Sequence, residues 1–141
     1  MSFLSAKDEQ AVVKEFERLA GPVTLTVFAS GLGPETNAQA VALIKEVAAL
    51  DKRISVAVLN PYIEREEAAA YGVDVTPAVV VEGARDYGIR FFGVPAGHEF
   101  SNLIDSIIAA SSGETGLSEE TRAALGGLTE DLVIKVFSTP T

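Results

Sequence analysis

Few side chains in this sequence could do chemistry, and cysteine is not among them. The 141 residues contain no Cys and one His, His98, which is followed by Glu99. An imidazole beside a carboxylate could act as an acid and base pair, because histidine titrates near neutral pH. Capping of a helix start or local hydrogen bonding explains the same two residues and is the interpretation that we favour. The lack of Cys excludes thiol catalysis, disulfide bonds and thiolate metal sites.

Two further motifs could hold a ligand. Gly31-x-Gly33 is typical of loops that cradle phosphate, but the Lys and Ser/Thr of a P-loop and the full dinucleotide pattern are missing. We therefore expect no nucleotide and no other cofactor. The acidic residues Glu64, Glu66 and Glu67 could bind a cation, yet an acidic first helical turn ordinarily complements the helix dipole. We predict no metal site there.

Composition argues against several classes of partner. Asp and Glu number 20 against 11 Lys and Arg, a formal charge of −9, so the chain lacks the basic surface that nucleic acid requires. No apolar run approaches the roughly 18 residues of a membrane span, and the first residues lack a secretory signal pattern. We predict a cytoplasmic protein that binds neither nucleic acid nor membrane.

Hydrophobic spacing and turn residues predict alternating helices and strands. A first helix begins at Ser5 and is ended by Gly21-Pro22, with the apolar stripe Val12, Val13, Phe16 and Leu19. The turn 31–37 leads into a second helix, with the stripe Val41, Ile44, Val47 and Ala48. Strands are predicted at 23–29, 54–59, 78–82 and 87–92, the last two forming a hairpin. The nearly continuous apolar run 54–59 is typical of a strand buried on both faces.

A short helix at 64–71 and a last helix with one apolar face, ending near Gly113, complete this pattern. The order helix, βαβ, helix, ββα predicts an α/β protein with a thioredoxin-like fold. Its central mixed sheet carries helices on both faces and is preceded by an extra N-terminal helix.

Two segments carry a more specific resemblance. Val75-Thr-Pro-Ala78 stands directly before the hairpin, and the second segment is Tyr87-Gly-Ile-Arg-Phe-Phe-Gly-Val-Pro-Ala-Gly-His-Glu-Phe100. The second closely resembles a stretch of the tandem-thioredoxin (glutaredoxin-like) protein disulfide oxidoreductases. The N-terminal region of the flavoprotein subunit of alkyl hydroperoxide reductase is similar. The resemblance implies a cis Thr76-Pro77 bond and a peptide-binding groove at Val75, Thr76 and Pro77.

The resemblance also shows what this chain lacks. Many such proteins carry Cys-x-x-Cys where the first strand meets its helix, because the helix N-terminus stabilises the attacking thiolate. The corresponding loop consists here of Gly31, Leu32, Gly33, Pro34, Glu35, Thr36 and Asn37. No residue in it is a comparable nucleophile, so we predict a degenerate active-site loop with no catalytic residue. The first half of the alkyl hydroperoxide reductase region likewise lacks the cysteines.

The chain begins to repeat itself near its end. Val23-Thr-Leu-Thr-Val-Phe-Ala-Ser30 returns as Leu132-Val-Ile-Lys-Val-Phe-Ser-Thr139, and each copy follows a segment that opens Leu-Ser and reads as a helix. The pattern indicates a truncated tandem duplication. We predict a thioredoxin-like domain with its lead helix at 1–113. Residues 114–141 would form a linker helix and the first strand of a second, missing unit.

Three functions remain open at this point. The first is a redox-inactive half of a thiol-disulfide oxidoreductase in cell redox homeostasis, partnered by a second thioredoxin-like unit or a protein substrate. The second is an autonomous peptide-binding module, and the third is a thiol-independent enzyme built on His98.

The apolar strand 132–137 must also be covered by another part of the chain or by a second molecule. It can fold back on its own sheet or form a homodimer with a second molecule, and the helix that precedes it favours the dimer.

Overall fold

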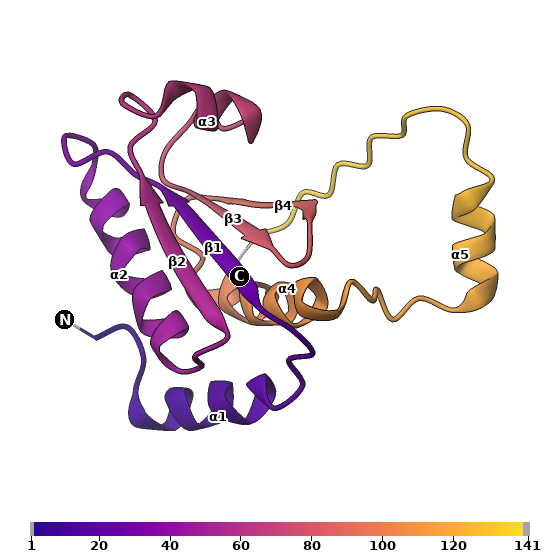
Figure 1. Ribbon diagram of the computed structural model, residues 1–141, viewed down its shortest axis with the longest axis horizontal. Coiled ribbons are helices and arrows are strands. Elements are labelled where there is room, and N and C mark those ends of the chain that lie inside the picture. The colour runs from indigo at the N-terminus through magenta and orange to yellow at the C-terminus, as the bar shows by residue number, and fades with distance from the viewer. Residues whose placement is uncertain (1, 140–141) are drawn as a thin grey trace.

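A four-stranded mixed sheet is the centre of the molecule. The computed structural model describes residues 2–139 and has the strand order β2-β1-β3-β4 (Figure 1). The strands are β1 (Val23–Phe28), β2 (Ile54–Leu59), β3 (Ala78–Glu82) and β4 (Asp86–Phe92). β1 pairs parallel with β2 and antiparallel with β3, and β3 pairs antiparallel with β4. The predicted thioredoxin-like arrangement is confirmed.

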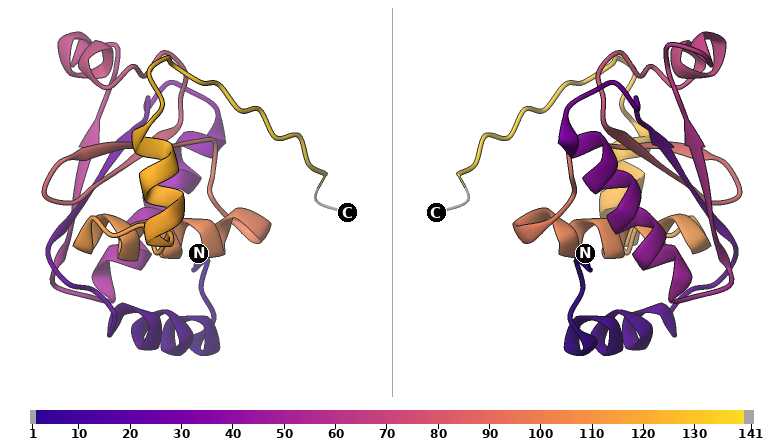
Figure 2. Two further views of the ribbon diagram at one scale, coloured as in Figure 1. Left: turned by 90° about the vertical axis from the view of Figure 1, so that its right-hand side faces the viewer. Right: turned by 90° about the vertical axis from the view of Figure 1, so that its left-hand side faces the viewer.

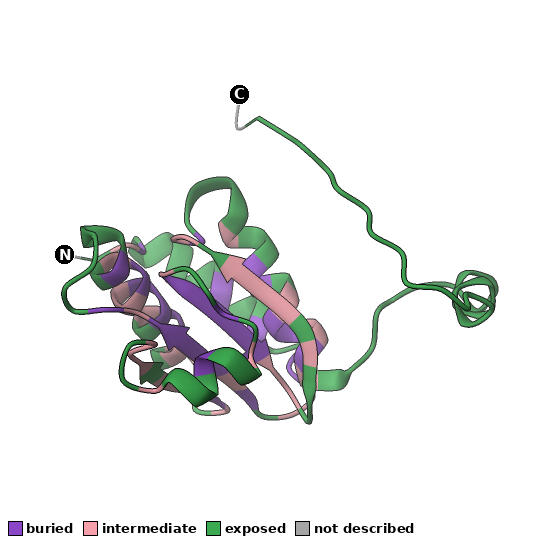
Figure 3. Cartoon of the chain, turned by 90° about the horizontal axis from the view of Figure 1, so that it is seen from above, coloured by how far each residue is buried: buried purple, intermediate pink, exposed green. Residues whose placement is uncertain are grey.

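Helices cover the two faces of the sheet unequally. The helices are α1 (Ala6–Phe16), α2 (Glu35–Ala49), α3 (Arg65–Ala70), the 3-10 helix η1 (Gly97–Glu99), α4 (Phe100–Ser112) and α5 (Glu119–Gly126). The large core lies between one face and α1, α2 and α4. On the other face, Ala68 of α3 packs with Phe28, Ala78 and Val80 in a small second cluster. The two central strands are consequently buried on both sides (Figure 3).

The strand β2 corrects a prediction. The apolar run 54–59 was expected to be buried on both faces, but β2 lies at the edge of the sheet. Its residue Val58 is 45% exposed, and Ser55 is exposed as well. Apolar residues alone do not distinguish a central strand from an edge strand that one helix covers only partly. The helix α2 carries alanines above the end of β2, so coverage is incomplete there.

Two apolar stripes differ in detail from their predictions. The helix α1 ends at Phe16, before Gly21-Pro22, and buries Val12 and Phe16, whereas Val13 is 46% exposed. The helix α2 buries Ile44 and Val47 as predicted, but Val41 and Ala48 are only half-buried. Its other buried residues are Asn37, Ala40 and Leu43. Several faces of a helix satisfy a three-to-four spacing when apolar residues are frequent, and packing selects one of them.

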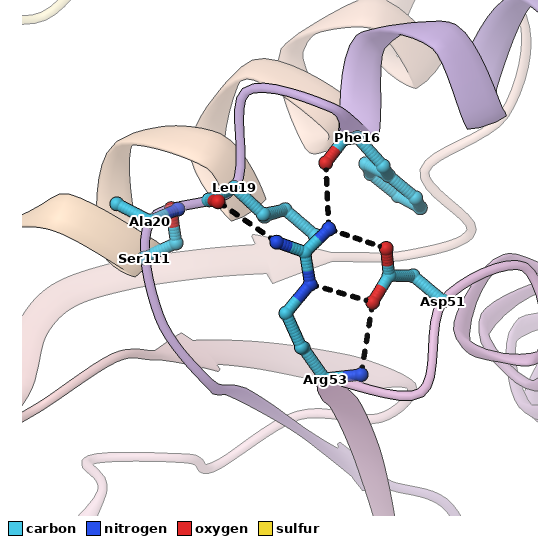
Figure 4. A network of polar contacts seen from close by, with 6 residues as sticks. All are labelled: Phe16, Leu19, Ala20, Asp51, Arg53 and Ser111. Carbon is cyan, nitrogen blue, oxygen red and sulfur yellow. Dashed lines mark hydrogen bonds and ion pairs between the residues drawn. The ribbon is translucent and has the colours of Figure 1, made fainter.

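Arg53 ties the end of α1 to the start of β2 (Figure 4). Its guanidinium donates from Nη1 to the carbonyl oxygen of Leu19 and from Nη2 to that of Phe16, both at 2.9 Å. It also binds Asp51 through Nε at 2.9 Å and Nη2 at 2.6 Å. The carbonyls at the end of a helix have no partner within it, and Arg53 supplies one. This network replaces the Gly-Pro stop that the sequence suggested.

The C-terminal residues stand apart from the rest. The helix α5 stands away from the body in Figures 1 and 3, and the extended segment after it runs away from the body in Figures 2 and 3. Every residue from 128 to 139 is exposed. The predicted strand 132–137 is therefore not part of a sheet among the described residues. A strand needs a neighbour for its backbone groups, and the segment pairs with none within residues 2–139. The expectation that this segment belongs to a second unit stays a prediction. Across residues 2–139, no helix is long and apolar enough to cross a membrane.

The Arg53 network generates a prediction about acid stability. Hydrogen bonds from Arg53 lower the pKa of Asp51 from 3.8 to about 2. A depressed folded-state pKa contributes stability that is complete above the unfolded value and is lost as the pH falls toward 2. We therefore expect Asp51→Asn to flatten the decline of the free energy of unfolding between about pH 4 and pH 2, measured by urea unfolding. Asp105→Asn, on the exposed side of α4, is the control. Equal pH profiles for the wild type and Asp51→Asn would contradict the assignment.

Candidate functional site

The loop between β1 and α2 is closed by the side chain of Asn37. This amide is almost fully buried; Oδ1 accepts the N–H of Ser30 at 2.9 Å, and Nδ2 donates to the carbonyl oxygen of Pro34 at 3.2 Å. The N–H of Gly33 donates to the carbonyl oxygen of Ser30 at 3.1 Å, which tightens the same turn. The loop is thus a hydrogen-bonded turn with both polar ends of Asn37 satisfied.

Gly33 is required by this closure. A Cβ at position 33 would lie 2.7 Å from Nδ2 of Asn37 and 3.2 Å from the carbonyl oxygen of Ser30. The amide cannot move away without leaving the buried N–H of Ser30 unpaired. Glycine and asparagine at these two positions therefore act as one unit.

The start of α2 carries no group that could replace a thiolate. Pro34 is the N-cap residue and Glu35 is the first helical residue, and no side chain caps this end. Leu32, immediately before, is fully exposed. A helix N-terminus stabilises a negative charge, but Glu35 supplies a carboxylate, which is no nucleophile for disulfides. The assignment of 31–37 as a degenerate active-site loop stays a prediction.

The segment 75–77 lies across from the loop 31–37, on the other side of a groove. The Thr76-Pro77 peptide bond is cis. The carbonyl oxygen of Pro77 accepts the N–H of Gly93 at 2.8 Å, so this residue is held against the end of β4. By contrast, the backbone N–H and C=O of Thr76 make no hydrogen bond within residues 2–139. Those two groups are available to an extended chain.

The structure brings the two predicted segments together around one groove. This central groove, of about 510 Å³, is lined by the loop, by Thr76 and by the turn after β2; its residues are Ser30, Leu32, Gly33, Pro34, Asn60, Tyr62, Ile63 and Thr76. A second groove of about 890 Å³ runs along α3 and shares Tyr62 and Thr76 with the first. The peptide-binding role of Val75, Thr76 and Pro77 stays a prediction.

Two wall residues were missed by sequence reasoning. Tyr62 and Ile63 follow Asn60-Pro61 in the turn after β2, and both are exposed. With Leu32 and Val75 they make an exposed apolar patch around Thr76, which we call the apolar rim. Large apolar residues in a turn are unusual, because turns favour small and polar residues. That signal could have identified them.

A polar cluster behind α3 fixes the wall of the groove. The Tyr71 hydroxyl donates to Glu82 Oε2 at 3.0 Å, and Arg90 Nε donates to the carbonyl oxygen of Tyr71 at 3.1 Å. Arg90 also forms a bidentate pair with Asp86 at 2.8 and 2.6 Å, which lowers the pKa of Asp86 to about 2. The hydrogen bond to Glu82 raises the pKa of Tyr71. The cluster joins the end of α3 to the hairpin and so positions the segment that leads to Thr76.

The other candidate residues lie away from these grooves. His98 and Glu99 are both exposed on η1 and belong to neither groove wall. Glu64 accepts the N–H of Asn60 at 2.7 Å, and Glu66 and Glu67 are exposed in the first turn of α3. The acidic residues thus serve as the start of a helix. Within the described part of the chain, no cluster of three potential metal ligands occurs.

Comparison with known proteins agrees with the fold. No protein-family model and no curated protein sequence matches the chain. The alkylhydroperoxide reductase component AhpF of Enterococcus faecalis, as a C503A mutant, is similar with a TM-score of 0.83 and 25% identity over 90% of this chain. A protein disulfide oxidoreductase of Aeropyrum pernix has a TM-score of 0.79 and 25% identity over 91% of this chain. The chain is a thioredoxin-like unit.

This thioredoxin-like unit is similar to the N-terminal domain of AhpF, with a TM-score of 0.79 over 85% of the chain. It spans 62% of the matched AhpF chain and 56% of the matched disulfide oxidoreductase. The resemblance that the sequence indicated is therefore confirmed in fold.

The closure of the loop can be tested at Asn37. We expect Asn37→Ala to lower the free energy of unfolding by about 1–3 kcal/mol, because it leaves the buried N–H of Ser30 without an acceptor. Urea unfolding measures this change. Asn102→Ala, at an exposed position of α4, is the matched control and should change stability little. Equal stabilities for the two variants would contradict the role of Asn37.

Proposed function

We propose that this thioredoxin-like unit is the redox-inactive half of a thiol-disulfide oxidoreductase, serving as a scaffold and as a docking site for polypeptide. One observation carries the proposal: the chain has no cysteine, although its fold is that of AhpF and of a protein disulfide oxidoreductase. The repeat of 23–30 at 132–139 supports a second thioredoxin-like unit as its partner. The proposed role is in cell redox homeostasis, and the proposed location is the cytoplasm.

The loop supports the inactive assignment on chemical grounds. Disulfide exchange requires a thiolate that attacks a sulfur atom. The residues at 31–37 offer a carboxylate, a hydroxyl and an amide, and the amide is already bound within the loop. The unit would contribute a docking surface and a rigid scaffold. The thiols for disulfide exchange would come from the second unit.

The docking role is supported by the groove. An extended polypeptide can pair with the unpaired N–H and C=O of Thr76, as a strand is added to a sheet edge. Its side chains would then contact the apolar rim, formed by Leu32, Tyr62, Ile63 and Val75. Main-chain pairing gives affinity without sequence preference, which suits a unit that presents varied protein substrates.

An autonomous peptide-binding module is the second candidate. The specific observation in its favour is that the described chain forms both walls of the groove by itself. The two functions differ in what they require, because a module binds peptide alone whereas a scaffold acts with its second unit. We do not propose the enzyme built on His98, since neither His98 nor Glu99 lines the two grooves beside Thr76.

The inactive assignment predicts the result of a reductase assay. The chain should not accelerate the reduction of insulin by dithiothreitol above the uncatalysed rate, because it contains no sulfur nucleophile. Turbidity of the precipitating insulin B chain measures the rate, with a cysteine-containing thioredoxin as the positive control. Thiol-dependent turnover by the pure chain would exclude a redox-inactive unit.

The docking assignment predicts a local response to peptide. Titration with carboxymethylated insulin B chain should shift the backbone amide signals of Val75 and Thr76 most strongly in NMR spectra. Ile63→Asp should weaken binding by at least about tenfold, because docking would bury an unpaired carboxylate. Val13→Asp, on an exposed part of α1, is the matched control and should bind normally. Shifts centred on His98 would contradict the assignment of this groove.

A further inference from the structure

The outer edge of β2 offers unpaired backbone groups over a defined length. The N–H of Val23 donates to the carbonyl oxygen of Arg53 at 3.0 Å, and that of Ala29 to Leu59 at 2.9 Å. Odd-numbered residues of β2 thus direct their backbone groups toward β1, and even-numbered residues direct theirs outward. Val56 and Val58 make no outward hydrogen bond within the described chain.

Both ends of this edge are closed. The N–H of Ile54 donates to the carbonyl oxygen of Asp51 at 3.1 Å. At the other end, the N–H of Asn60 donates to Glu64 Oε2 at 2.7 Å, and its carbonyl oxygen accepts from Ile63 and Glu64. The open stretch therefore runs from the carbonyl of Ile54 to that of Val58, which is the length of a short strand.

An apolar groove accompanies this edge. It has a volume of about 570 Å³ and lies between α2 and the end of β2, where Ala38, Val41, Ala42 and Val58 line it. The small side chains of α2 leave room above the edge for the side chains of one more strand. Val58 points into this room and is 45% exposed.

The other edge of the sheet is protected. Pairing of β3 with β4 is irregular between Val81 and Glu82, and Gly88 in β4 has a φ of 86°. Asp86 and Arg90 form an ion pair along the same strand. Irregular pairing and charges are the features by which proteins prevent strand addition. The open stretch of β2 has neither irregular pairing nor a charged residue.

The segment 132–137 matches this edge. It is extended and exposed, and five of its six residues are large and apolar. It also repeats β1, the strand that occupies the inner edge of β2, where Val23, Leu25 and Val27 lie opposite Ile54, Val56 and Val58. The corresponding residues of the repeat are Leu132, Ile134 and Val136. The same pattern of residues is thus available for the outer edge.

We propose that segment 132–137 of one molecule pairs with the outer edge of β2 in a second copy, and that the exchange is reciprocal. Leu132, Ile134 and Val136 then lie on the face of the sheet that carries the apolar groove at Val58, and Lys135 lies on the opposite face, as the exposed Ser55 does. A reciprocal exchange closes into a two-fold dimer with two such pairings. Because α5 holds the segment away from its own sheet (Figure 2), pairing joins two molecules. This inference does not use Thr76 or the docking role, although residues of the loop 31–37 also line the groove. It applies to segment 132–137 where that segment is exposed, as in the 141-residue chain, and not where a second unit takes it into its own sheet.

Light scattering over a concentration series of the 141-residue chain tests the dimer. The wild type should reach twice the monomer mass, and amide exchange at Val56 and Val58 should slow as concentration rises. Val58→Lys and Ile134→Lys should each raise the dissociation constant at least about tenfold, because each places a charge in the apolar contact. Ile134 is exposed in the monomer, so its replacement leaves the folded body intact.

Matched controls and a mixing experiment locate the contact. Val13→Lys and Leu128→Lys replace residues of similar exposure outside the proposed contact and should dimerise as the wild type does. A mixture of Val58→Lys and Ile134→Lys retains one intact segment and one intact edge, so it should form dimers at concentrations where neither variant alone does. A wild type that stays monomeric would overturn the proposal. So would a Val58→Lys variant that dimerises as tightly as the wild type, because pairing would then join segment to segment.

Discussion

The strand β1 is buried on both faces and flanked on both edges, and this burial organises the molecule. Water cannot reach its backbone, so its N–H and C=O groups must be paired within the sheet. Its neighbours, parallel β2 and antiparallel β3, meet that requirement. The antiparallel pairing places the end of β1 beside the start of β3. The loop that follows β1 and the segment that precedes β3 therefore meet at one end of the sheet, and the groove results from this pairing.

The loop 31–37 is held by its own hydrogen bonds and contains no thiol. A reactive thiolate depends on charge stabilisation at the helix start, which is a demanding arrangement. In this chain the hydrogen bonds of the Asn37 amide hold the turn 30–37, and Gly33 leaves the space that the amide needs. The wall around Thr76 is fixed separately, by the cluster of Tyr71, Glu82 and Arg90. The loop and the wall around Thr76 are thus fixed by separate sets of contacts.

Much of the architecture could be predicted from sequence because strong local signals agree with it. Strand β3 lies where the hairpin pattern put it. That the loop 31–37 and Thr76 line one groove was not predicted, because it depends on how the strands pair. The exposure of Val58 and Val13 could not be predicted, because it depends on which elements pack against them in the folded chain. The segment 132–137 has the residues of a strand and no partner in the described chain. Tyr62 and Ile63 were missed because their role comes from the turn's place beside Thr76.

The central place of β1 also has a consequence for biosynthesis. Its partners come later in the chain, since Val23 pairs with Ile54 and Thr24 with Glu82. At a synthesis rate of roughly 5–20 residues per second, the apolar side chains of β1 wait on the order of several seconds for β3. During that time the helix α2 and the strand β2 can cover one face and one edge. The other edge stays unpaired until the hairpin emerges, so this interval is when the nascent chain is most exposed to pairing with wrong strands.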